Sequence, residues 1–529
     1  MKNKLLIPIL LGLAVVFGLL IGMFLNYPSR KFSLTPSQED QRQQKIRQII
    51  DYIDFEYVDN VNTDSLLDIT ITDLLRRLDP HSTYIPIDEV AANEESIRGS
   101  FEGIGIEFRI FRDTLTVVNV IDDGPSDKAG IKAGSRILYA NGEALFGEGV
   151  DNNRVISTLK GKSGSKVKLD LYIPASQKSL SKTVKRGEVP LRSVQAAFMA
   201  NERTGYIRLT RFSETSVKEL KAAIKQIQKK GADQMILDLR DNPGGLLGAA
   251  RDVADQFLAE GDMIVFTRDR EGQKNEIYAT DKGLFEKGKL VVLINEGSAS
   301  ASEIVAGAVQ DNDRGVLVGR RSFGKGLVQE EIRLSDGSRM RLTTQRYYTP
   351  TGRSIQKPYG DYDEGFLKRN GYSGDLPTQD SSSVAHSAYR TPAGRTVYGG
   401  GGITPDVEVP FDTSRSAALI YHVSLMTNLD DKAFMYVDQH RKRFSGMSLQ
   451  QFKESFVVND TVMDFFFGDR IDVKERLGDA SRQVLITRIK ATIASNIFGN
   501  SSYIEVYFAE DPMIHEALEQ LNKDYAWQP

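Results

Sequence analysis

Residues 294–307 read INEGSASASEIVAG, and they join an apolar run typical of a buried strand to a pattern typical of a helix. The strand is expected over residues 289–294 and the helix over residues 301–310. Three serines stand at alternate positions in the junction, namely Ser298, Ser300 and Ser302. The question is whether one of these serines is a nucleophile or whether they only begin a helix.

Strand and helix patterns alternate on both sides of this junction. Strand-like runs occupy residues 204–209, 234–239 and 315–319, and helical patterns occupy residues 216–230 and 246–258. Such alternation predicts an α/β fold. The three serines therefore lie where a strand of that fold passes into a helix.

Ser300 and Glu303 have the spacing of a capping box, in which a serine and a glutamate three residues later satisfy free N–H groups at a helix start. Spacing alone favours this structural role. A strand-to-helix junction can also hold a hydroxyl group beside free N–H groups that would stabilise an oxyanion. Both roles stay open at this level, because one neighbourhood can accommodate both.

The composition of the chain argues against several classes of protein. Its 529 residues, 40% of them hydrophobic, are enough for two or three cores. The net charge of −3 and the scattered Lys and Arg residues argue against nucleic-acid binding. There is no cysteine, and the five histidines lack ligand spacing, so neither a metal site nor a cofactor is expected.

The N-terminal segment has the character of a membrane anchor. Residues 5–25 carry no charge, and as a helix they would span roughly 31 Å. No small-residue cleavage site follows, so residues 1–27 are predicted to be an uncleaved signal anchor rather than a removed signal peptide. The remaining chain would then lie in the periplasm, held at the inner membrane.

Residues 28–98 are predicted to form an N-terminal helical region. An apolar stripe at helical spacing, which could join copies of the chain into a homo-oligomer, consists of Ile46, Ile49, Ile50, Ile53 and Tyr57. A second helix over residues 65–78 should end at the Asp79-Pro80 step, because proline cannot continue it. His81, which follows, is interpreted as a structural turn residue rather than as a ligand.

Residues 99–186 change to a strand-like period and resemble a PDZ domain. The resemblance rests on the loop Gly103-Ile104-Gly105-Ile106, on residues 129–137 (AGIKAGSRI) and on the following Asn-Gly pair. In such a loop, glycines let successive N–H groups converge on an anion, while an adjoining strand edge pairs with an extended peptide. The expected partner is the C-terminal tail of a protein; the alternative is an ordinary hairpin that contains glycine.

Four motifs follow this region in a fixed order: DLRDNPGG at residues 238–245, NEGSASASEI at 295–304, GRRSFGKGLVQ at 319–329 and GITPD at 402–406. Together with the PDZ-like region they closely resemble the carboxyl-terminal processing proteases, the tail-specific serine peptidases of family S41. The resemblance implies a crotonase/ClpP-like α/β core over residues 187–410, with the PDZ domain inserted between that core and the N-terminal helices. Near residues 356–402 the core is expected to contain a loop-rich connection.

The resemblance also assigns catalytic roles. It makes Ser300 the nucleophile, Lys325 the general base and Gln329 the residue that orients the lysine. The implied activity is that of a serine endopeptidase that cleaves exported proteins near their C-termini. Independently, no histidine lies between residues 81 and 386, and a lysine between glycines with apolar neighbours can be buried so that its pKa falls. Without the family pattern, however, a lysine between two glycines would be interpreted as a solvated turn residue.

Backbone N–H groups are implied as the oxyanion donors. One comes from Ala301, and the other from Gly244 or Gly245, two glycines that the sequence does not distinguish.

Residues 411–529 extend beyond the resemblance and are predicted to form a mainly helical domain that packs on the core or mediates assembly. Two alternatives to a protease are a peptide-binding scaffold with an inactive core and an acyl-CoA enzyme of crotonase type. The intact Ser300, Lys325 and Gln329 argue against the first, and the inserted PDZ-like region and the predicted export argue against the second.

Overall fold

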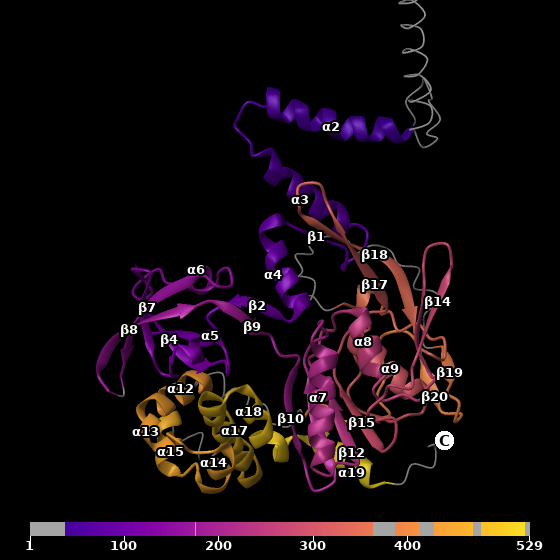
Figure 1. Cartoon of the computed structure of the whole chain (residues 1–529). Helices are drawn as coiled ribbons and strands as arrows, with labels where there is room; N and C mark the ends of the chain where they lie inside the picture. The colour runs from indigo at the N-terminus through magenta and orange to yellow at the C-terminus, as the bar shows by residue number, and fades with distance from the viewer. Residues whose placement is uncertain are drawn as a thin grey trace, which may run out of the picture. The chain divides into compact units, whose positions relative to one another are not determined.

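The computed structural model describes residues 38–174, 176–362, 387–412, 420, 428–468 and 478–523 (Figure 1). The chain divides into two compact units, residues 1–73 and 74–529. The predicted membrane segment, residues 5–25, lies outside the described residues, as does much of the predicted loop-rich connection. Among the helices that are described, none is both long and apolar enough to cross a bilayer.

The first unit contains helix α2 (Gln38–Glu56) and most of helix α3 (Thr63–Arg76). Four of the five residues of the predicted stripe lie on α2, where Ile46 is 61% exposed and Ile49 51% exposed, whereas Tyr57 follows the end of the helix. The side chain of Asn62 accepts a hydrogen bond from the Ser65 backbone N–H at 3.1 Å and so caps the start of α3.

The PDZ-like region is an antiparallel sheet with strand order β3-β4-β5-β7-β8. Its strands are β3 (Ile106–Phe111), β4 (Thr114–Val120), β5 (Arg136–Ala140), β7 (Lys166–Ile173) and β8 (Lys178–Lys185). Helix α6 (Asn152–Leu159) packs Val155 and Leu159 into the same apolar core. Because β3 is the terminal strand, one of its edges has no strand partner among the described residues.

A short ladder closes the base of this region. Strand β2 (Ser100–Gly103) enters the domain and pairs antiparallel with strand β9 (Gly187–Pro190), which leaves it. The chain therefore enters and leaves at one place, as expected for a domain inserted into another.

The core contains a six-stranded sheet of order β10-β11-β12-β15-β16-β21. Its strands are β10 (Val194–Met199), β11 (Thr204–Leu209), β12 (Gln234–Asp238), β15 (Lys289–Ile294), β16 (Val316–Gly319) and β21 (Val407–Glu408). From β11 onward the strands run parallel, whereas β10 is antiparallel to β11.

Both faces of this sheet are covered, which explains why its strands are continuous apolar runs rather than alternating ones. One face packs against helices α7 (Ser216–Lys229), α8 (Leu247–Ala254) and α9 (Ala301–Asp311). The other face, which includes Val291 and Leu293, packs against helix α19 (Pro512–Asn522).

A second sheet flanks the first and carries part of the cavity wall described below. It contains β1 (Thr83–Ile85), β13 (Met263–Arg268), β14 (Lys274–Tyr278), β17 (Leu327–Arg333) and β18 (Arg339–Tyr348). Strand β18 pairs with β1, β13 and β17. Strands β13, β14, β17 and β18 were not predicted from the sequence.

The C-terminal region is helical, as predicted. Its helices are α12 (Leu429–Gln439), α13 (Arg441–Phe444), α14 (Leu449–Ser455), α15 (Asp460–Phe467), α17 (Asp479–Phe498) and α18 (Asn500–Tyr507). All of these helices, which precede α19 in the chain, contribute to one aromatic core that includes Phe452, Phe456 and Phe466. The predicted α/β core with an inserted β-rich domain and helical regions on both sides is thus confirmed.

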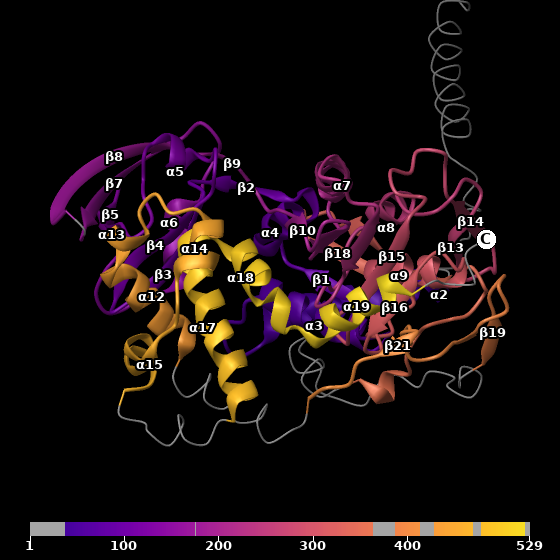
Figure 2. The ribbon, with the colours of Figure 1, turned by 90° about the horizontal axis from the view of Figure 1, so that it is seen from below.

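The C-terminal helices also contact the PDZ-like region (Figure 2). Arg136 of β5 forms a two-fold ion pair with Asp438 of α12, at 2.6 Å between Nη2 and Oδ2 and 3.2 Å between Nη1 and Oδ1. Arg109 pairs with Asp431, and the rings of Phe111 and Phe434 lie 5.4 Å apart. The contact combines charge and aromatic packing, so it joins the two regions specifically.

Candidate active site

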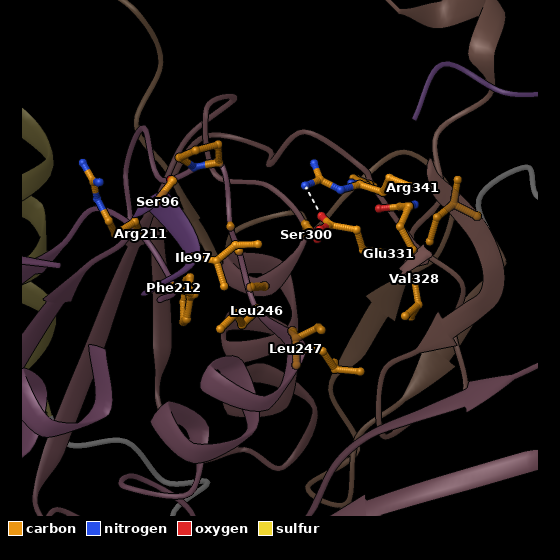
Figure 3. A pocket seen from close by; sticks show the side chains of 18 of the residues that line it. Ser96, Ile97, Arg211, Phe212, Leu246, Leu247, Ser300, Val328, Glu331 and Arg341 are labelled. Carbon is orange, nitrogen blue, oxygen red and sulfur yellow. Dashed lines mark hydrogen bonds and ion pairs between the residues drawn. The ribbon is translucent and has the colours of Figure 1, made fainter. Parts of the chain in front are cut away.

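Ser300 opens onto a cavity of about 750 Å³ (Figure 3). In this view Ile97, Phe212 and Leu246 lie to the left of the serine, Leu247 lies below it, and Val328, Glu331 and Arg341 are labelled to its right. The six residues predicted to take part in catalysis all line this cavity: Gly244, Gly245, Ser300, Ala301, Lys325 and Gln329.

The structure separates Ser300 from its two neighbouring serines. The Ser298 hydroxyl donates to the carbonyl oxygen of Leu239 at 2.8 Å, and the Ser302 hydroxyl donates to that of Asn242 at 2.8 Å. Both side chains are fully buried. Only Ser300 of the three lines the cavity, so it is the serine that a substrate can reach.

Ser300 has an unusual backbone conformation, with φ 55° and ψ −111° immediately before α9. These angles match the second residue of a type II′ turn, a position that normally favours glycine. A Cβ atom at Gly244 would lie 2.9 Å from the Ser300 Cβ and 2.7 Å from the Ala299 carbonyl oxygen. A side chain at position 244 would therefore displace the serine.

Glu303 links the serine to the lysine. Its Oε2 accepts hydrogen bonds from the backbone N–H groups of Ser300 at 2.8 Å and Lys325 at 2.9 Å. Its Oε1 accepts from the Ser322 hydroxyl at 2.5 Å and from the Gly324 N–H at 2.7 Å. Burial raises the pKa of Glu303 to about 7, and these hydrogen bonds act against that rise.

A tyrosine reinforces the same link. The hydroxyl of Tyr347, which is 1% exposed, lies 2.6 Å from the carbonyl oxygen of Lys325 and 3.1 Å from that of Ser300. Its single proton can be donated to either oxygen. The spacing of Ser300 and Glu303 predicts only a helix cap, and no pattern in the sequence points to Tyr347.

The environment of Lys325 favours the neutral amine. Burial, followed by the positive charge of Arg341, lowers the pKa of Lys325 to about 8, while the negative charges of Asp79 and Glu303 act in the opposite direction. Arg341 is itself held by Glu331, with 3.2 Å between Nη2 and Oε2. A lysine with this pKa can serve as a base near neutral pH.

Two predicted contacts of the lysine are not made. No hydrogen bond joins Lys325 Nζ to Ser300 Oγ in the part of the chain that the structure describes. Gln329 donates from Nε2 to the hydroxyl of Thr343 at 3.2 Å, not to the lysine. The orienting role of Gln329 therefore stays a prediction.

The backbone distinguishes the two candidate oxyanion glycines. The N–H of Gly244 donates to Asn242 Oδ1 at 2.9 Å. Within the described ranges, the N–H groups of Gly245 and Ala301 donate to no acceptor. The geometry therefore favours Gly245 over Gly244 as the partner of Ala301.

The loop Gly103-Ile104-Gly105-Ile106 connects β2 to the edge strand β3. The carbonyl groups of Ile104 and Gly105 accept hydrogen bonds from Ser126 and Ile121. Across the described residues, the N–H groups of Ile104 and Gly105 have no acceptor. Gly105 has φ +74°, the left-handed conformation that glycine tolerates best.

Comparison with known proteins decides the family. A model of peptidase family S41 matches residues 203–364, and a PDZ domain model matches residues 103–182. The chain is 37% identical over 334 residues to a carboxy-terminal-processing protease of Bartonella bacilliformis, covering 61% of this chain and 75% of that protein. This chain is a carboxy-terminal processing protease of peptidase family S41.

A second relative of the protease agrees with this assignment. It is 33% identical over 326 residues to the carboxy-terminal processing protease CtpB of Bacillus subtilis, covering 61% of this chain and 67% of that one. Among solved structures, a photosystem II D1 C-terminal processing protease aligns at 28% identity and a TM-score of 0.35, covering 69% of this protease and 86% of that chain. Residues 421–499 match a family of unknown function.

Proposed function

We propose that this protease cleaves peptide bonds with a Ser300–Lys325 dyad and selects its substrates by their C-terminal tails. The observation that carries the proposal is the cavity in which Ser300 and Lys325 lie together with the N–H groups of Gly245 and Ala301, which have no acceptor among the described residues. Glu303 supports it, because one oxygen of this carboxylate accepts from both the serine and the lysine backbone.

In the proposed reaction, neutral Lys325 removes the proton of the Ser300 hydroxyl as the serine oxygen attacks the substrate carbonyl carbon. The N–H groups of Ala301 and Gly245 stabilise the oxyanion that forms. Lys325 then gives its proton to the departing amine, and water later releases the acyl group from Ser300. Hydrogen bonds between catalytic groups often form only when substrate is bound, so the proposed mechanism does not require a Ser300–Lys325 hydrogen bond in the substrate-free protein.

The Ser300→Ala, Lys325→Ala and Lys325→Arg variants test the dyad on an unstructured protein substrate. All three variants should be inactive. The two alanine variants lack the proposed nucleophile or the proposed base, and the guanidinium of Lys325→Arg does not lose its proton at working pH. The double variant Ser300→Ala with Lys325→Ala should be scarcely worse than either single one, because the residues act as a unit. Gln329→Ala should be less impaired. Near wild-type turnover by Lys325→Arg, or inhibition by EDTA, would contradict the dyad.

The PDZ domain is proposed to capture the carboxylate of a substrate tail at residues 103–106. Two observations support this role: within the described part of the chain, the N–H groups of Ile104 and Gly105 have no acceptor and one edge of β3 has no strand partner. A peptide with a free apolar C-terminus should bind roughly 1–3 kcal/mol more tightly than its amidated form, measured by calorimetry with the Ser300→Ala protein. Equal affinities would contradict carboxylate capture by the PDZ domain and would not bear on the proposed Ser300–Lys325 dyad.

Anchoring at the inner membrane, with the catalytic part in the periplasm and exported proteins as substrates, is proposed from the uncharged residues 5–25. The full chain should fractionate with membranes, whereas a truncated protein that begins at residue 31 should be soluble. Recovery of the full chain as a soluble protein of reduced mass would mean instead that the segment is cleaved.

A homo-oligomer is proposed from the exposed stripe of α2. Sedimentation of the soluble protein should show more than one chain per particle. Replacing both Ile46 and Ile49, which are 61% and 51% exposed, with glutamate should dissociate it. A monomeric parent protein would contradict this use of the stripe.

A further inference from the structure

His81 lies in a turn that Asp79 holds rigid. Asp79 Oδ1 accepts from the backbone N–H groups of His81 and Ser82, both at 2.8 Å, and Oδ2 accepts from the Ser82 hydroxyl at 2.7 Å. His81 is 9% exposed and Asp79 is 6% exposed. The predicted turn is thus present, but its histidine points inward and has a partner distant in sequence.

That partner is Tyr362. Nε2 of His81 and Oη of Tyr362 are 2.8 Å apart, and the two rings meet edge to face with centroids 5.6 Å apart. Burial, followed by the positive charge of Lys325, lowers the pKa of His81 to about 3. The imidazole is therefore neutral near pH 7. It also lies close enough to Lys325 for the positive charge of the lysine to lower the pKa of His81 further.

Gln356 continues the contact toward the lysine. Its Oε1 accepts from the Gly326 N–H at 2.8 Å, while its Nε2 donates to the Lys357 carbonyl at 2.8 Å and to Tyr362 Oη at 3.0 Å. The Gly326 N–H and the Lys357 carbonyl fix which end of the amide is oxygen. Tyr362 therefore accepts from Gln356, which favours donation of its own proton to His81 Nε2.

Residues 356 and 357 pack closely against the two glycines that flank Lys325. A Cβ atom at Gly324 would lie 2.8 Å from the Lys357 Cβ, and one at Gly326 would lie 3.0 Å from the Gln356 backbone nitrogen. The Lys357 N–H also donates to the Gly324 carbonyl at 2.9 Å. The two glycines beside Lys325 thus permit residues 356–357 to set the position of its loop.

We infer that His81 is a positioning residue for Lys325: through Tyr362 and Gln356 it holds the loop that carries the proposed general base. The inference rests on the role proposed above for Lys325. His81, Tyr362 and Gln356 do not line the cavity that holds Ser300. Loss of the link should therefore impair the chemical step and leave substrate binding nearly unchanged.

The test uses His81→Phe, Tyr362→Phe and the double variant in the full chain. Each single variant should lower kcat by about 10- to 100-fold, the effect of a misplaced catalytic group, with KM changed less than about twofold. The double variant should be no worse than the poorer single one, because both break the same link. His81→Gln, whose amide oxygen can accept from Tyr362, should recover most of the activity.

Tyr436→Phe is the matched control. It removes the same oxygen atom from a tyrosine that is 5% exposed, as Tyr362 is, but that lies in the aromatic core of the C-terminal helices. Its kcat should equal that of the wild type. The rate at which a fluorophosphonate labels Ser300 should follow the same order as kcat across the variants.

Wild-type kcat in Tyr362→Phe, or independent losses that multiply in the double variant, would overturn the inference. Tyr362→Phe removes one atom only, so it decides the question even where His81→Phe does not fold. The outcomes also separate the two proposals. An active Lys325→Ala protein would reject the dyad, whereas an inactive Lys325→Ala beside a fully active Tyr362→Phe would reject the positioning role alone.

Discussion

The backbone N–H groups of Ser300 and Lys325 donate to one and the same atom, Oε2 of Glu303, at 2.8 and 2.9 Å. The proposed nucleophile and the proposed base belong to different elements, the start of α9 and the loop before β17. A single buried carboxylate therefore holds the two backbones at a fixed distance from each other, independently of the conformations of the Ser300 and Lys325 side chains.

Replacing Glu303 with glutamine should weaken both the fold and the activity. All four groups bound to the carboxylate are donors, and the NH₂ group of glutamine would face two of them. Leaving buried donors unsatisfied costs about 1–3 kcal/mol each, so the loss of two such bonds should lower the free energy of unfolding by roughly 2–6 kcal/mol. Thermal unfolding and turnover should both be measured; a variant that matches the wild type in both would contradict the bridging role.

The pH dependence of cleavage should follow the amine of Lys325. Because a base must be deprotonated and the pKa of Lys325 is about 8, kcat/KM should rise with pH through about 8. Arg341→Gln removes a charge that lowers this pKa, so its profile should shift to higher pH. Its activity should then be low at pH 7.5 and recover in alkaline buffer. An unshifted profile would show that Arg341 does not act on the amine.

Lys325 should also lower the stability of the folded protein. Its pKa is 10.5 in the unfolded chain and about 8 when folded, so the penalty on the charged amine is full below pH 8 and vanishes above pH 10.5. The inactive variant Lys325→Met should therefore be more stable at pH 7, by up to roughly 3 kcal/mol. The advantage should shrink as pH rises toward 10.5. Denaturant unfolding at the two pH values decides, and a gain that is equal at both would exclude titration of the lysine as its cause.

The ion pair between Arg136 and Asp438 should hold the PDZ domain against the C-terminal helices. Arg136→Asp leaves two carboxylates opposed across a largely buried contact, which should cost about 1–3 kcal/mol and speed proteolysis in both regions. The swapped pair, Arg136→Asp with Asp438→Arg, should restore part of the protection; recovery is incomplete because Arg441, whose Nε donates to Asp438 Oδ1 at 3.0 Å, loses that partner. Equal proteolysis of all three proteins would mean that the pair does not join the regions.

The sequence predicted those parts of the fold whose residues carry a local signal. Strand β15 and helix α9 agree with prediction because a strand buried on both faces is a continuous apolar run and because Ser300 and Glu303 mark a helix start. Strands β17 and β18 were missed, since their sequences LVQEEIR and RMRLTTQRYY mix charged and apolar residues without strict alternation.

The site divides in the same way. The motifs predicted Ser300, Lys325 and the two glycines as site residues. Only the backbone geometry distinguishes Gly245, whose N–H has no acceptor among the described residues, from Gly244, whose N–H is already bonded. The second partner of Glu303, the Lys325 N–H, and the contact of His81 with Tyr362 join segments far apart in the chain. No periodicity within a single element encodes such contacts.

Helix α19 completes the hydrophobic covering of the catalytic sheet, with Met513, Ile514 and Leu521 packed in the cluster that includes Val291 and Leu293. During translation, the strands emerge from the ribosome long before this helix does. The apolar face of the sheet that includes Val291 and Leu293 therefore stays partly uncovered in a nascent chain until residues 512–522 have been made, and the sheet lacks that part of its packing until then.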